Sequence, residues 1–475
     1  MSVRTFTLCC ALLLASVAFA LPVQSAAQSA AQPPAQSAAQ WRAQQLEASR
    51  QSEYIMHEAN KHKGLLARYE VMRYAYTANK DPAFRLIFGQ YLSWYQSFIG
   101  DYPDAAASFS IKEVAQADDH PSPLDTAGYT AHPALAAIAE LAENYQLVML
   151  NEAHNVPLTR TLTVQLLPQL RAQGFNYFAV ETLYQSDQAL AARGYPVPDS
   201  GFYTAEPISA EMVRTALKLG FHVVGYEALS DATGDAREAE QARNIYRDVF
   251  QRDPRARLVV EAGYAHIQQS GAFLGGKPMA QHLHRLSGID ALAVEQTMLI
   301  PHPHEDDDHP LYTAIVQQLQ PREPIVFLNA SGKPWTLRDG YTVSVIFPPQ
   351  QLRRGRPTWL SLGGLRQPYV VNGDRCAEHF PCLIEARYAS EGDDAIPADR
   401  MVLDPLPATA TLNDRVRHGQ SIPSGELYLR PGKYRLNISD KDAYTLFRQN
   451  IVINAVPGTA PTVPAATSST SLPSP

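Results

Sequence analysis

The sequence predicts a mixed α/β protein: a mostly parallel sheet with helices on both faces, preceded by an α-helical region and followed by a small β-sandwich. The main observation is that short apolar runs alternate with helical stretches through the middle of the chain. In one such stretch Leu158, Leu162 and Leu166 recur at the i+4 spacing of a helix. This alternation is typical of parallel strands joined by right-handed helical crossovers. The apolar runs lie at 145–150, 177–180, 221–226, 258–260, 289–294 and 325–328.

Length and composition are those of an ordinary globular protein. The chain has 475 residues, of which 45% are hydrophobic and 18% are charged, and this composition excludes a fully disordered or fibrous chain. Its 40 basic residues against 47 acidic ones give a net charge of −7. A nucleic-acid or anionic membrane partner requires a concentrated basic surface, so neither is expected.

The two ends of the chain predict export and little regular structure. Residues 1–26 resemble a signal peptide, with Arg4 before a short apolar run and small residues suited to cleavage after Ala20 or Ala26. A membrane anchor is the alternative, but the run is short for a bilayer span. We therefore expect an exported protein, periplasmic or secreted, without stable membrane insertion. Residues 27–40 are expected to form a low-complexity linker and 456–475 a disordered tail.

Two regions flank the expected α/β domain of residues 131–350. Residues 41–130 are expected to form a helical cap region. Their helical pattern runs from Trp41 to about Ser110 and in part resembles a single tetratricopeptide-type unit. Such a unit cannot stack alone, so a helical cap packed on the next domain is expected. Residues 351–455 are expected to form the β-sandwich, in part from two strands around the Pro431-Gly432 turn. A protein partner could bind either flanking region.

Two cysteines remain once a signal peptide is removed, Cys376 and Cys382. In an oxidising compartment they are expected to form a short-loop disulfide. A metal site that also uses His379 is the alternative, but the neighbourhood shows no fourth ligand.

Acidic residues and histidines recur where the predicted strands end. The carboxyl ends of parallel strands meet at one edge of a sheet, where α/β proteins bind ligands. Each residue alone has an ordinary structural explanation, but strand interiors are depleted in Glu and Asp. The set therefore predicts an acidic, histidine-bearing active site. Its members are Glu152, His154, Glu181, Glu227, Asp231, Glu261, Tyr264, His266 and Glu295.

Two kinds of water chemistry suit this set. Glu152, His154 and His266 could hold a divalent metal ion that activates water. In the metal-free alternative, a histidine deprotonates water while a carboxylate orients it. Nucleophilic serine chemistry is not indicated, because no Gly-x-Ser-x-Gly elbow occurs in the chain.

The same residues resemble the erythromycin esterase-like family over about residues 145–300. The motif Asn-Glu152-Ala-His154, followed by Gly174-Phe175 and Val180-Glu181, is similar to the opening of that family. The segment that begins at Arg237 and continues Glu-x-Glu-Gln-x-x-Asn resembles its arginine-containing helix. Gly263-Tyr-Ala-His266 resembles its second histidine strand. The broader superfamily also contains haem-binding uptake lipoproteins and Tiki/TraB metalloprotease-like proteins.

The resemblance implies roles for individual residues. His154 would be the general base, Glu152 and Glu181 would polarise or orient water, Arg237 would steady an anionic intermediate, and His266 would complete the pocket. Asn151 stands where a glycine is usual, and Glu261 stands where the esterases are apolar or aromatic. Because of these two departures, a macrolide substrate is not implied.

We therefore expect an exported hydrolase that cleaves an ester, lactone or amide bond in a small-molecule or peptide substrate. The main alternative is a haem- or metal-binding envelope protein without catalysis, in which Tyr264 beside His266 would supply the axial haem ligand. A third alternative is a scaffold that binds a partner and keeps only a vestigial pocket. The sequence does not identify a cofactor; a divalent metal and haem both remain candidates.

Overall fold

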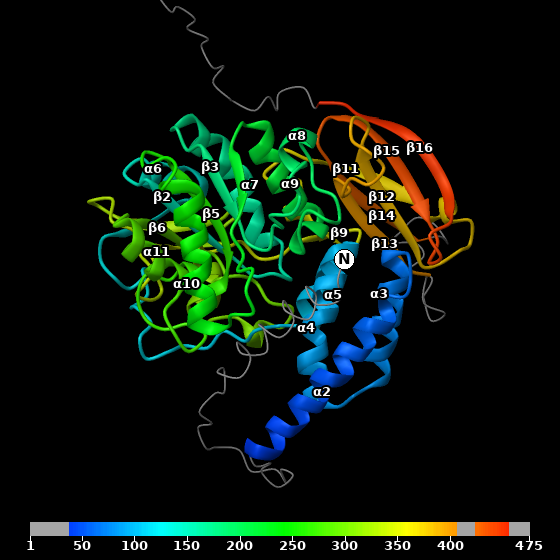
Figure 1. Cartoon of the computed structure of the whole chain (residues 1–475), viewed down its shortest axis with the longest axis horizontal. Helices are drawn as coiled ribbons and strands as arrows, with labels where there is room; N and C mark the ends of the chain where they lie inside the picture. The colour runs from blue at the N-terminus through cyan, green and yellow to red at the C-terminus, as the bar shows by residue number, and fades with distance from the viewer. Residues whose placement is uncertain (1–37, 406–422, 456–475) are drawn as a thin grey trace, which may run out of the picture.

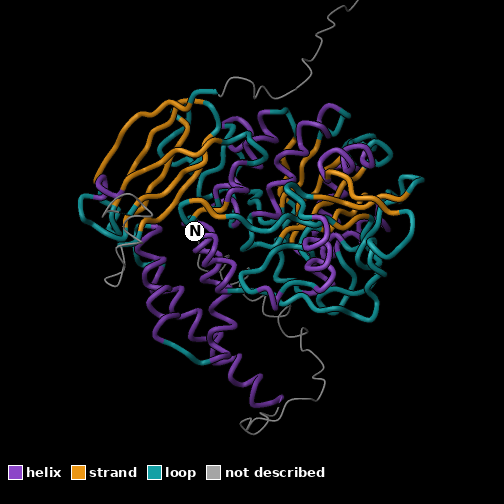
Figure 2. Tube along the Cα trace, turned by 180° about the vertical axis from the view of Figure 1, so that it is seen from behind, coloured by secondary structure: helices purple, strands orange, loops and turns teal. Residues whose placement is uncertain are grey.

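The computed structural model describes residues 38–405 and 423–455 of the chain. A helical region, an α/β domain and a group of antiparallel strands follow one another along the chain and lie against each other (Figure 1). The view from behind shows the same three parts (Figure 2). The expected signal peptide and tail lie outside the described residues, as does the linker except at its end. There the structure corrects the boundary, because the first described helix already begins at Ala38.

The helical region consists of α2 (Ala38–Ala59), α3 (Leu65–Ala78), α4 (Pro82–Ile99) and α5 (Tyr102–Ser108). Helix α4 is central to it and is almost entirely buried. Asp81 caps its start by accepting a hydrogen bond from the Phe84 amide at 2.9 Å, and Gly100 ends it with a positive φ of 84°. The helices end at Ser108, close to residue 110, where the helical pattern of the sequence ends. The segment after them runs along the α/β domain, where the Pro121 carbonyl accepts a hydrogen bond from the Trp335 indole.

The central sheet of the α/β domain has six parallel strands, which confirms the predicted mixed α/β class. Their order is β4-β3-β5-β2-β6-β8. The register pairs Glu152 at the end of β2 with Gly263 at the end of β5, so the site residues emerge at one edge. The strands are β2 (Leu147–Glu152), β3 (Tyr177–Val180), β4 (His222–Gly225), β5 (Leu258–Gly263), β6 (Ala291–Glu295) and β8 (Val343–Ser344).

One predicted strand pairs differently from expectation. β7 (Ile325–Asn329) lies outside the six-stranded sheet and pairs antiparallel with β1 (Tyr129–Pro133). The short β8 takes the edge position beside β6 instead. An apolar run identifies a buried strand but not its partner, so the sequence pattern could not separate these two arrangements.

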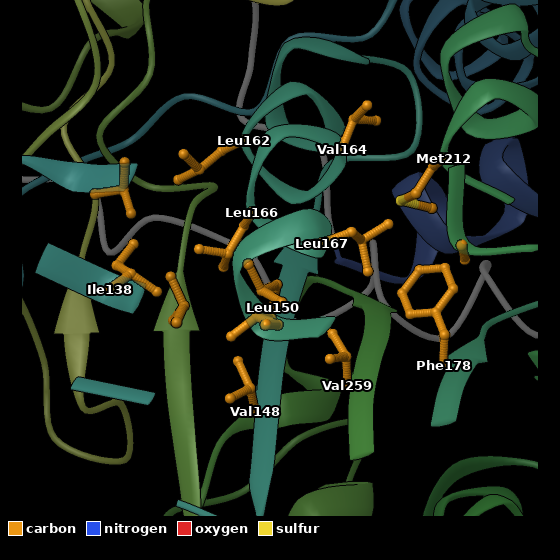
Figure 3. Packing of buried hydrophobic residues seen from close by; sticks show 14 of the residues in the cluster. Ile138, Val148, Leu150, Leu162, Val164, Leu166, Leu167, Phe178, Met212 and Val259 are labelled. Atoms are coloured by element: carbon orange, nitrogen blue, oxygen red, sulfur yellow. The ribbon is translucent and has the colours of Figure 1, made fainter. Parts of the chain in front are cut away.

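Helices cover both faces of the parallel sheet because residues of each strand alternate between the faces. Val148 and Leu150 of β2 pack against α6 (Ala134–Ala142), α7 (Leu158–Ala172) and α9 (Pro207–Lys218) (Figure 3). Leu147 and Met149 face the opposite layer, which contains α10 (Gly234–Ile245) and α11 (Met279–Ser287). The strands buried on both faces explain the nearly continuous apolar runs in the sequence.

The C-terminal region contains two antiparallel sheets that share one core. The larger has the order β13-β12-β15-β16, and the smaller pairs β11 with β14. Cys376 and Cys382 are joined by a disulfide and are buried in this core. The residues from 352 to 366, expected as part of the sandwich, instead form a short hairpin and turn before β11. The strands are β9 (Leu352–Arg353), β10 (Arg356–Pro357), β11 (Gln367–Asn372), β12 (Cys382–Tyr388), β13 (Asp399–Leu403), β14 (Ser424–Leu429), β15 (Gly432–Ser439) and β16 (Thr445–Ile453).

Across residues 38–405 and 423–455, no helix combines the length and the apolar character that crossing a bilayer requires.

Candidate active site

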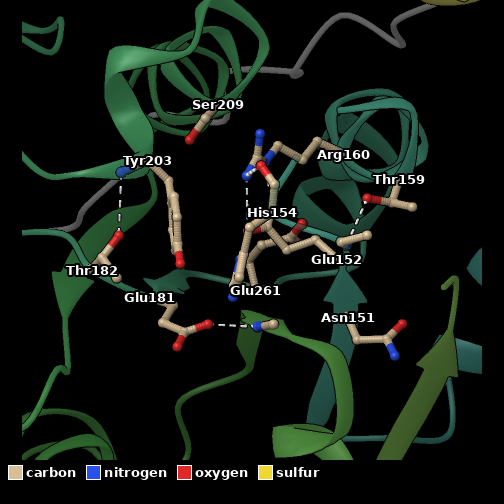
Figure 4. Close-up of polar contacts among 12 residues, drawn as sticks. Asn151, Glu152, His154, Thr159, Arg160, Glu181, Thr182, Tyr203, Ser209 and Glu261 are labelled. Carbon is tan, nitrogen blue, oxygen red and sulfur yellow. Dashed lines mark hydrogen bonds and ion pairs between the residues drawn. The ribbon is translucent and has the colours of Figure 1, made fainter. Parts of the chain in front are cut away.

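Glu152 and His154 form a buried carboxylate–imidazole pair where β2 ends. The His154 Nδ1 lies 2.8 Å from Glu152 Oε1. Arg160, in the first turns of α7, binds both oxygens of Glu152, with its Nη2 2.9 Å from Oε1 and its Nε on Oε2 (Figure 4). The same Nη2 donates to the His154 carbonyl at 3.1 Å. All three side chains are buried, so the arginine fixes both members of the pair.

The turn between β2 and α7 is held by Thr159. Its hydroxyl donates to the Val156 carbonyl at 2.9 Å and accepts from the Ala153 amide at 3.1 Å. These bonds tie the residue that follows β2 to the first turn of α7. The turn therefore sets the position of His154 relative to Arg160.

Arg160 also binds Glu206, the residue that caps the start of α9. Its Nη1 lies 3.2 Å from Glu206 Oε2. Glu206 accepts from the amides of Ile208 and Ser209, each at 2.8 Å, and from the Tyr102 hydroxyl at 3.0 Å. Burial raises the pKa of Glu206. Burial would also raise the pKa of Glu152, but the charge of Arg160 and the bond to His154 outweigh it and lower that pKa.

A second carboxylate–imidazole pair is built from His266 and Glu238. The His266 Nδ1 lies 2.7 Å from Glu238 Oε2, which also accepts from the Met279 amide at 2.9 Å. The Arg237 Nη1 faces the other ring nitrogen, His266 Nε2, at 3.5 Å. Burial disfavours the imidazolium, but Glu238 and Glu181 outweigh it and raise the pKa of His266.

Glu181, at the end of β3, lies between the two histidines. Its Oε1 is 3.1 Å from Arg237 Nη2 and 3.4 Å from His266 Nε2. Its Oε2 accepts from the Gly263 amide at 2.5 Å. A Cβ on Gly263 would lie 2.5 Å from His154 Nε2 and 3.1 Å from Glu181 Oε2, so both groups meet over this glycine.

The charge of Glu181 is strongly stabilised. Burial alone would raise its pKa, but His266, His154 and Arg237 outweigh burial and hold the pKa at about 2. Glu181 therefore stays ionised at neutral pH and can accept, but not donate, a hydrogen bond there.

Two tyrosines cover the His154 ring. Tyr203 stacks on it with the ring centroids 4.1 Å apart and an angle of 17° between the planes (Figure 4). Tyr264 meets it edge-on at 5.1 Å. Tyr203 belongs to the segment between β3 and α9, so this segment must shift before a substrate can reach the face of the ring that it covers.

The remaining predicted residues fall into two groups. Glu227 binds Arg237 through both oxygens, at 3.0 and 2.7 Å. Glu261 is buried and accepts from the Thr163 hydroxyl at 3.0 Å; burial and the nearby Glu152 raise its pKa well above the ordinary value. These two join the cluster.

Glu295 and Asp231 differ from the expectation. Glu295 Oε1 accepts from the amides of Thr297 and Met298, so this carboxylate caps the turn after β6. Asp231 is exposed in the loop before α10. Glu295 is the last residue of β6 and Asp231 lies in a loop; neither position along the chain fixes where the side chain points, which explains why these two lie outside the cluster.

The donor set does not suit a metal ion. Among the described residues, no group of three or more His, Cys, Asp and Glu side chains could hold one. Of the expected set of Glu152, His154 and His266, the carboxylate of Glu152 has both oxygens occupied by Arg160. The Nε2 of His266 faces the guanidinium of Arg237, a cation that would repel a metal.

The expected haem ligands do not fit either. Tyr264, the expected axial tyrosine, packs edge-on against the His154 ring, with the ring centroids 5.1 Å apart. His266 is held between Glu238 and Arg237, so both of its ring nitrogens already face charged partners.

Four residues of the cluster were not predicted. Glu238 had a sequence signal, since it adjoins Arg237 in the quoted helix motif. Arg160 had a weaker one, as a charged residue in the first turns of the helix that follows β2. Tyr203 and Glu206 had none, because only the tertiary fold brings the start of α9 to the end of β2.

Comparison with known proteins gives no family. No protein-family model and no curated protein matches the chain. Among solved structures, the type III effector HopBA1 is similar at 14% identity over 36% of this chain and 87% of its own, with a TM-score of 0.27. The effector domain RRSP of a MARTX toxin from Vibrio vulnificus CMCP6 is similar at 17% identity over 48% of this chain and 51% of its own, with a TM-score of 0.26.

A structure described as bacterial protein toxins gives 14% identity over 54% of this chain and 56% of its own, with a TM-score of 0.27. The chain thus spans about half the length of the last two proteins. TM-scores this low support no conclusion about fold or function.

Proposed function

We propose that the protein is an exported hydrolase that cleaves an ester, lactone or amide bond with water activated by His154. The observation that carries the proposal is the convergence of two buried carboxylate–imidazole pairs on Glu181 at the carboxyl edge of the parallel sheet. Ion pairs that serve only stability need no second imidazole at the same point. Perturbed titratable groups gathered at such an edge are typical of active sites.

His154 is the proposed general base. Glu152 accepts a hydrogen bond from the Nδ1–H group of His154, and this bond leaves Nε2 as the basic nitrogen. A water molecule bound at Nε2 gives up a proton to it as the water oxygen attacks the carbonyl carbon. Arg160 keeps Glu152 ionised, so the carboxylate can stabilise the imidazolium that forms.

His266 is the proposed general acid. Its raised pKa favours the protonated ring, which can give a proton to the leaving oxygen or nitrogen as the tetrahedral intermediate collapses. Arg237 carries the positive charge nearest to His266 and would stabilise the negative oxygen of that intermediate. Glu181 remains ionised and orients the attacking water.

We also propose membership of the erythromycin esterase-like superfamily and export by the signal peptide expected at residues 1–26. The support for membership is that the five residues of the motifs, spread over three strand ends and one helix, come together in one cluster: Glu152, His154, Glu181, Arg237 and His266. The substrate proposed is a small molecule or peptide rather than a macrolide, because Asn151 and Glu261 depart from the esterase pattern.

The test is a panel of fluorogenic esters, lactones and amides assayed with wild type and with Glu152→Gln and His154→Ala. We expect each variant to lose at least about 100-fold in kcat/KM, the usual size of a general-base effect. Asp290→Asn is the matched control, since this carboxylate is 83% exposed and distant from the cluster along the chain. Circular dichroism checks that each variant is folded.

Two results would overturn the proposed hydrolase activity. One is unchanged turnover by His154→Ala. The other is a wild type that cleaves no member of the panel and purifies with an absorption band of bound haem.

A further inference from the structure

A cavity of about 920 Å³ lies where the helical region, the α/β domain and the larger antiparallel sheet meet. Figure 1 shows this place where α3 and α4 approach β12 and β13. Its walls come from the turn between α2 and α3, the segment 198–205, and strands β12, β15 and β16. Cavities between domains with volumes of about 300–1,000 Å³ are common ligand sites.

The wall of the cavity is basic, although the whole chain is acidic. Lysines and arginines outnumber aspartates and glutamates by seven to four among the lining residues, whereas the net charge of the chain is −7. A concave surface of one sign focuses the electrostatic potential and attracts ions of the other sign.

Several of the cations are available to a ligand. Glu385 is already bound by Arg387 and Arg400, at 2.9 and 2.8 Å. By contrast, no ion pair to a carboxylate within the described residues occupies Lys63, Arg68 or Arg448. These last three side chains come from opposite walls, two beside the α2–α3 turn and one on β16.

The remaining lining suits an apolar body. The aromatic side chains Tyr95, Phe98, Tyr184 and Phe202 all line the cavity. Aromatic faces bind flat or apolar groups, while separated cations fix a carboxylate or phosphate.

We propose that this cavity binds an amphipathic organic anion, with an aromatic or apolar body and a carboxylate or phosphate group. The body lies on the aromatic side chains and the anionic group lies between Arg448 and the cations of the α2–α3 turn. This binding does not depend on the proposed hydrolysis.

The cavity is separated from His154 by a single stretch of chain. Phe202 lines the cavity, and the next residue, Tyr203, stacks on His154. Trp94 contacts both rings, with centroids 5.4 Å from Phe202 and 6.2 Å from Tyr203. Trp94 therefore reports a ligand that moves Phe202, and its fluorescence measures binding without any assay of activity.

The test uses 2-naphthoate and 2-naphthyl phosphate as probes, with naphthalene-2-carboxamide as the neutral analogue and inorganic phosphate as the anion without a body. Calorimetry and Trp94 fluorescence measure binding to the full chain, and Trp94→Phe identifies the fluorescence that belongs to this residue. We expect both aromatic anions to bind at least about tenfold more tightly than the carboxamide or phosphate. The probe that binds more tightly shows whether the cavity prefers a carboxylate or a phosphate group.

Charge reversal locates the site. Lys63→Glu with Arg448→Glu should weaken binding of the preferred anion at least about tenfold. Arg285→Glu with Lys333→Glu makes the same change of charge at two exposed positions outside the cavity and should leave binding unchanged. Equal affinity for the anion and the carboxamide would overturn the proposal, and so would equal weakening by the two double variants.

Discussion

The pKa values of two neighbouring carboxyl groups in the cluster are shifted in opposite directions by their immediate partners. Arg160 keeps Glu152 charged. Glu261 lies two positions before Gly263 on β5, and its hydrogen-bond partner among the described residues is the neutral hydroxyl of Thr163 rather than a cation. Burial raises the pKa of Glu261, and the negative charge of Glu152 adds to the effect. The charged form is therefore favoured at Glu152 and the neutral form at Glu261.

The change Glu261→Gln tests this difference. An acid with a raised folded-state pKa takes up a proton on folding, so its contribution to stability falls as pH rises above the ordinary value of 4.5. The glutamine cannot titrate. The free energy of unfolding of the Glu261→Gln variant, relative to that of wild type, should therefore rise with pH. The rise is up to about 1.4 kcal/mol for each pH unit above the ordinary pKa. Urea unfolding at pH 5, 6 and 7 measures the difference, and a difference that does not change with pH would contradict the assignment.

The sequence predicted which side chains cluster where a strand end alone fixed their place. Glu152, Glu181 and His266 follow buried runs, and the parallel register brings them together. Partners that stabilise these residues were harder to predict. Glu206 depends on where α9 docks, and nothing in the local pattern near residue 206 encodes that contact.

At the scale of elements, the end of β5 is fitted to the His154 ring. Gly263 has φ of −72°, an ordinary value that any residue can adopt. Its missing side chain is needed for space, because a Cβ would lie 2.2 Å from His154 Cε1. The strand end and the imidazole therefore share one small volume.

The change Gly263→Ala should displace the His154 ring and break its bond to Glu152. We expect a loss of about 1–3 kcal/mol in the free energy of unfolding, the usual cost of overpacking, together with a loss of turnover on any substrate found. In a His154→Ala background the clash with the ring is gone, so most of that loss should disappear. Urea unfolding of the single and double variants measures the coupling; equal cost in both backgrounds would show that the ring is not what Gly263 accommodates.

Element boundaries and pairings were predicted less reliably than element types. The runs at 145–150 and 258–260 became β2 and β5 of the parallel sheet, as their buried apolar character indicated. The run at 325–328 formed a strand, but it paired with β1 instead of joining the parallel sheet. An apolar run indicates a buried strand and does not specify its partner. Helix α2 begins within the expected linker, where alanine and glutamine favour a helix as readily as they suit a flexible segment.

At the scale of the whole molecule, two buried arginines connect the helical region to the antiparallel sheets. Arg400 Nη1 donates to the Phe98 carbonyl at 2.6 Å, and Arg356 Nη1 donates to the Gly100 carbonyl at 2.6 Å. Both carbonyls lie at the end of α4, where a helix has no backbone partners of its own. Phe98, at this end of α4, packs against Phe202. The next residue, Tyr203, stacks on His154, so the position of α4 affects the site.

The change Arg356→Met should loosen this junction. Arg356 Nη2 binds both oxygens of the buried Asp399, at 2.7 and 2.8 Å, and loss of one partner of a buried ion pair costs about 3–5 kcal/mol. We expect a lower urea midpoint and faster amide hydrogen exchange at the end of α4, with β2 unchanged until global unfolding. Asp399→Asn in the same chain removes the stranded charge and should recover part of the stability but not the slow exchange of α4. If α4 exchanges as in wild type while stability falls, Arg356 stabilises only the sheet, and its hydrogen bond to the Gly100 carbonyl does not hold the helical region.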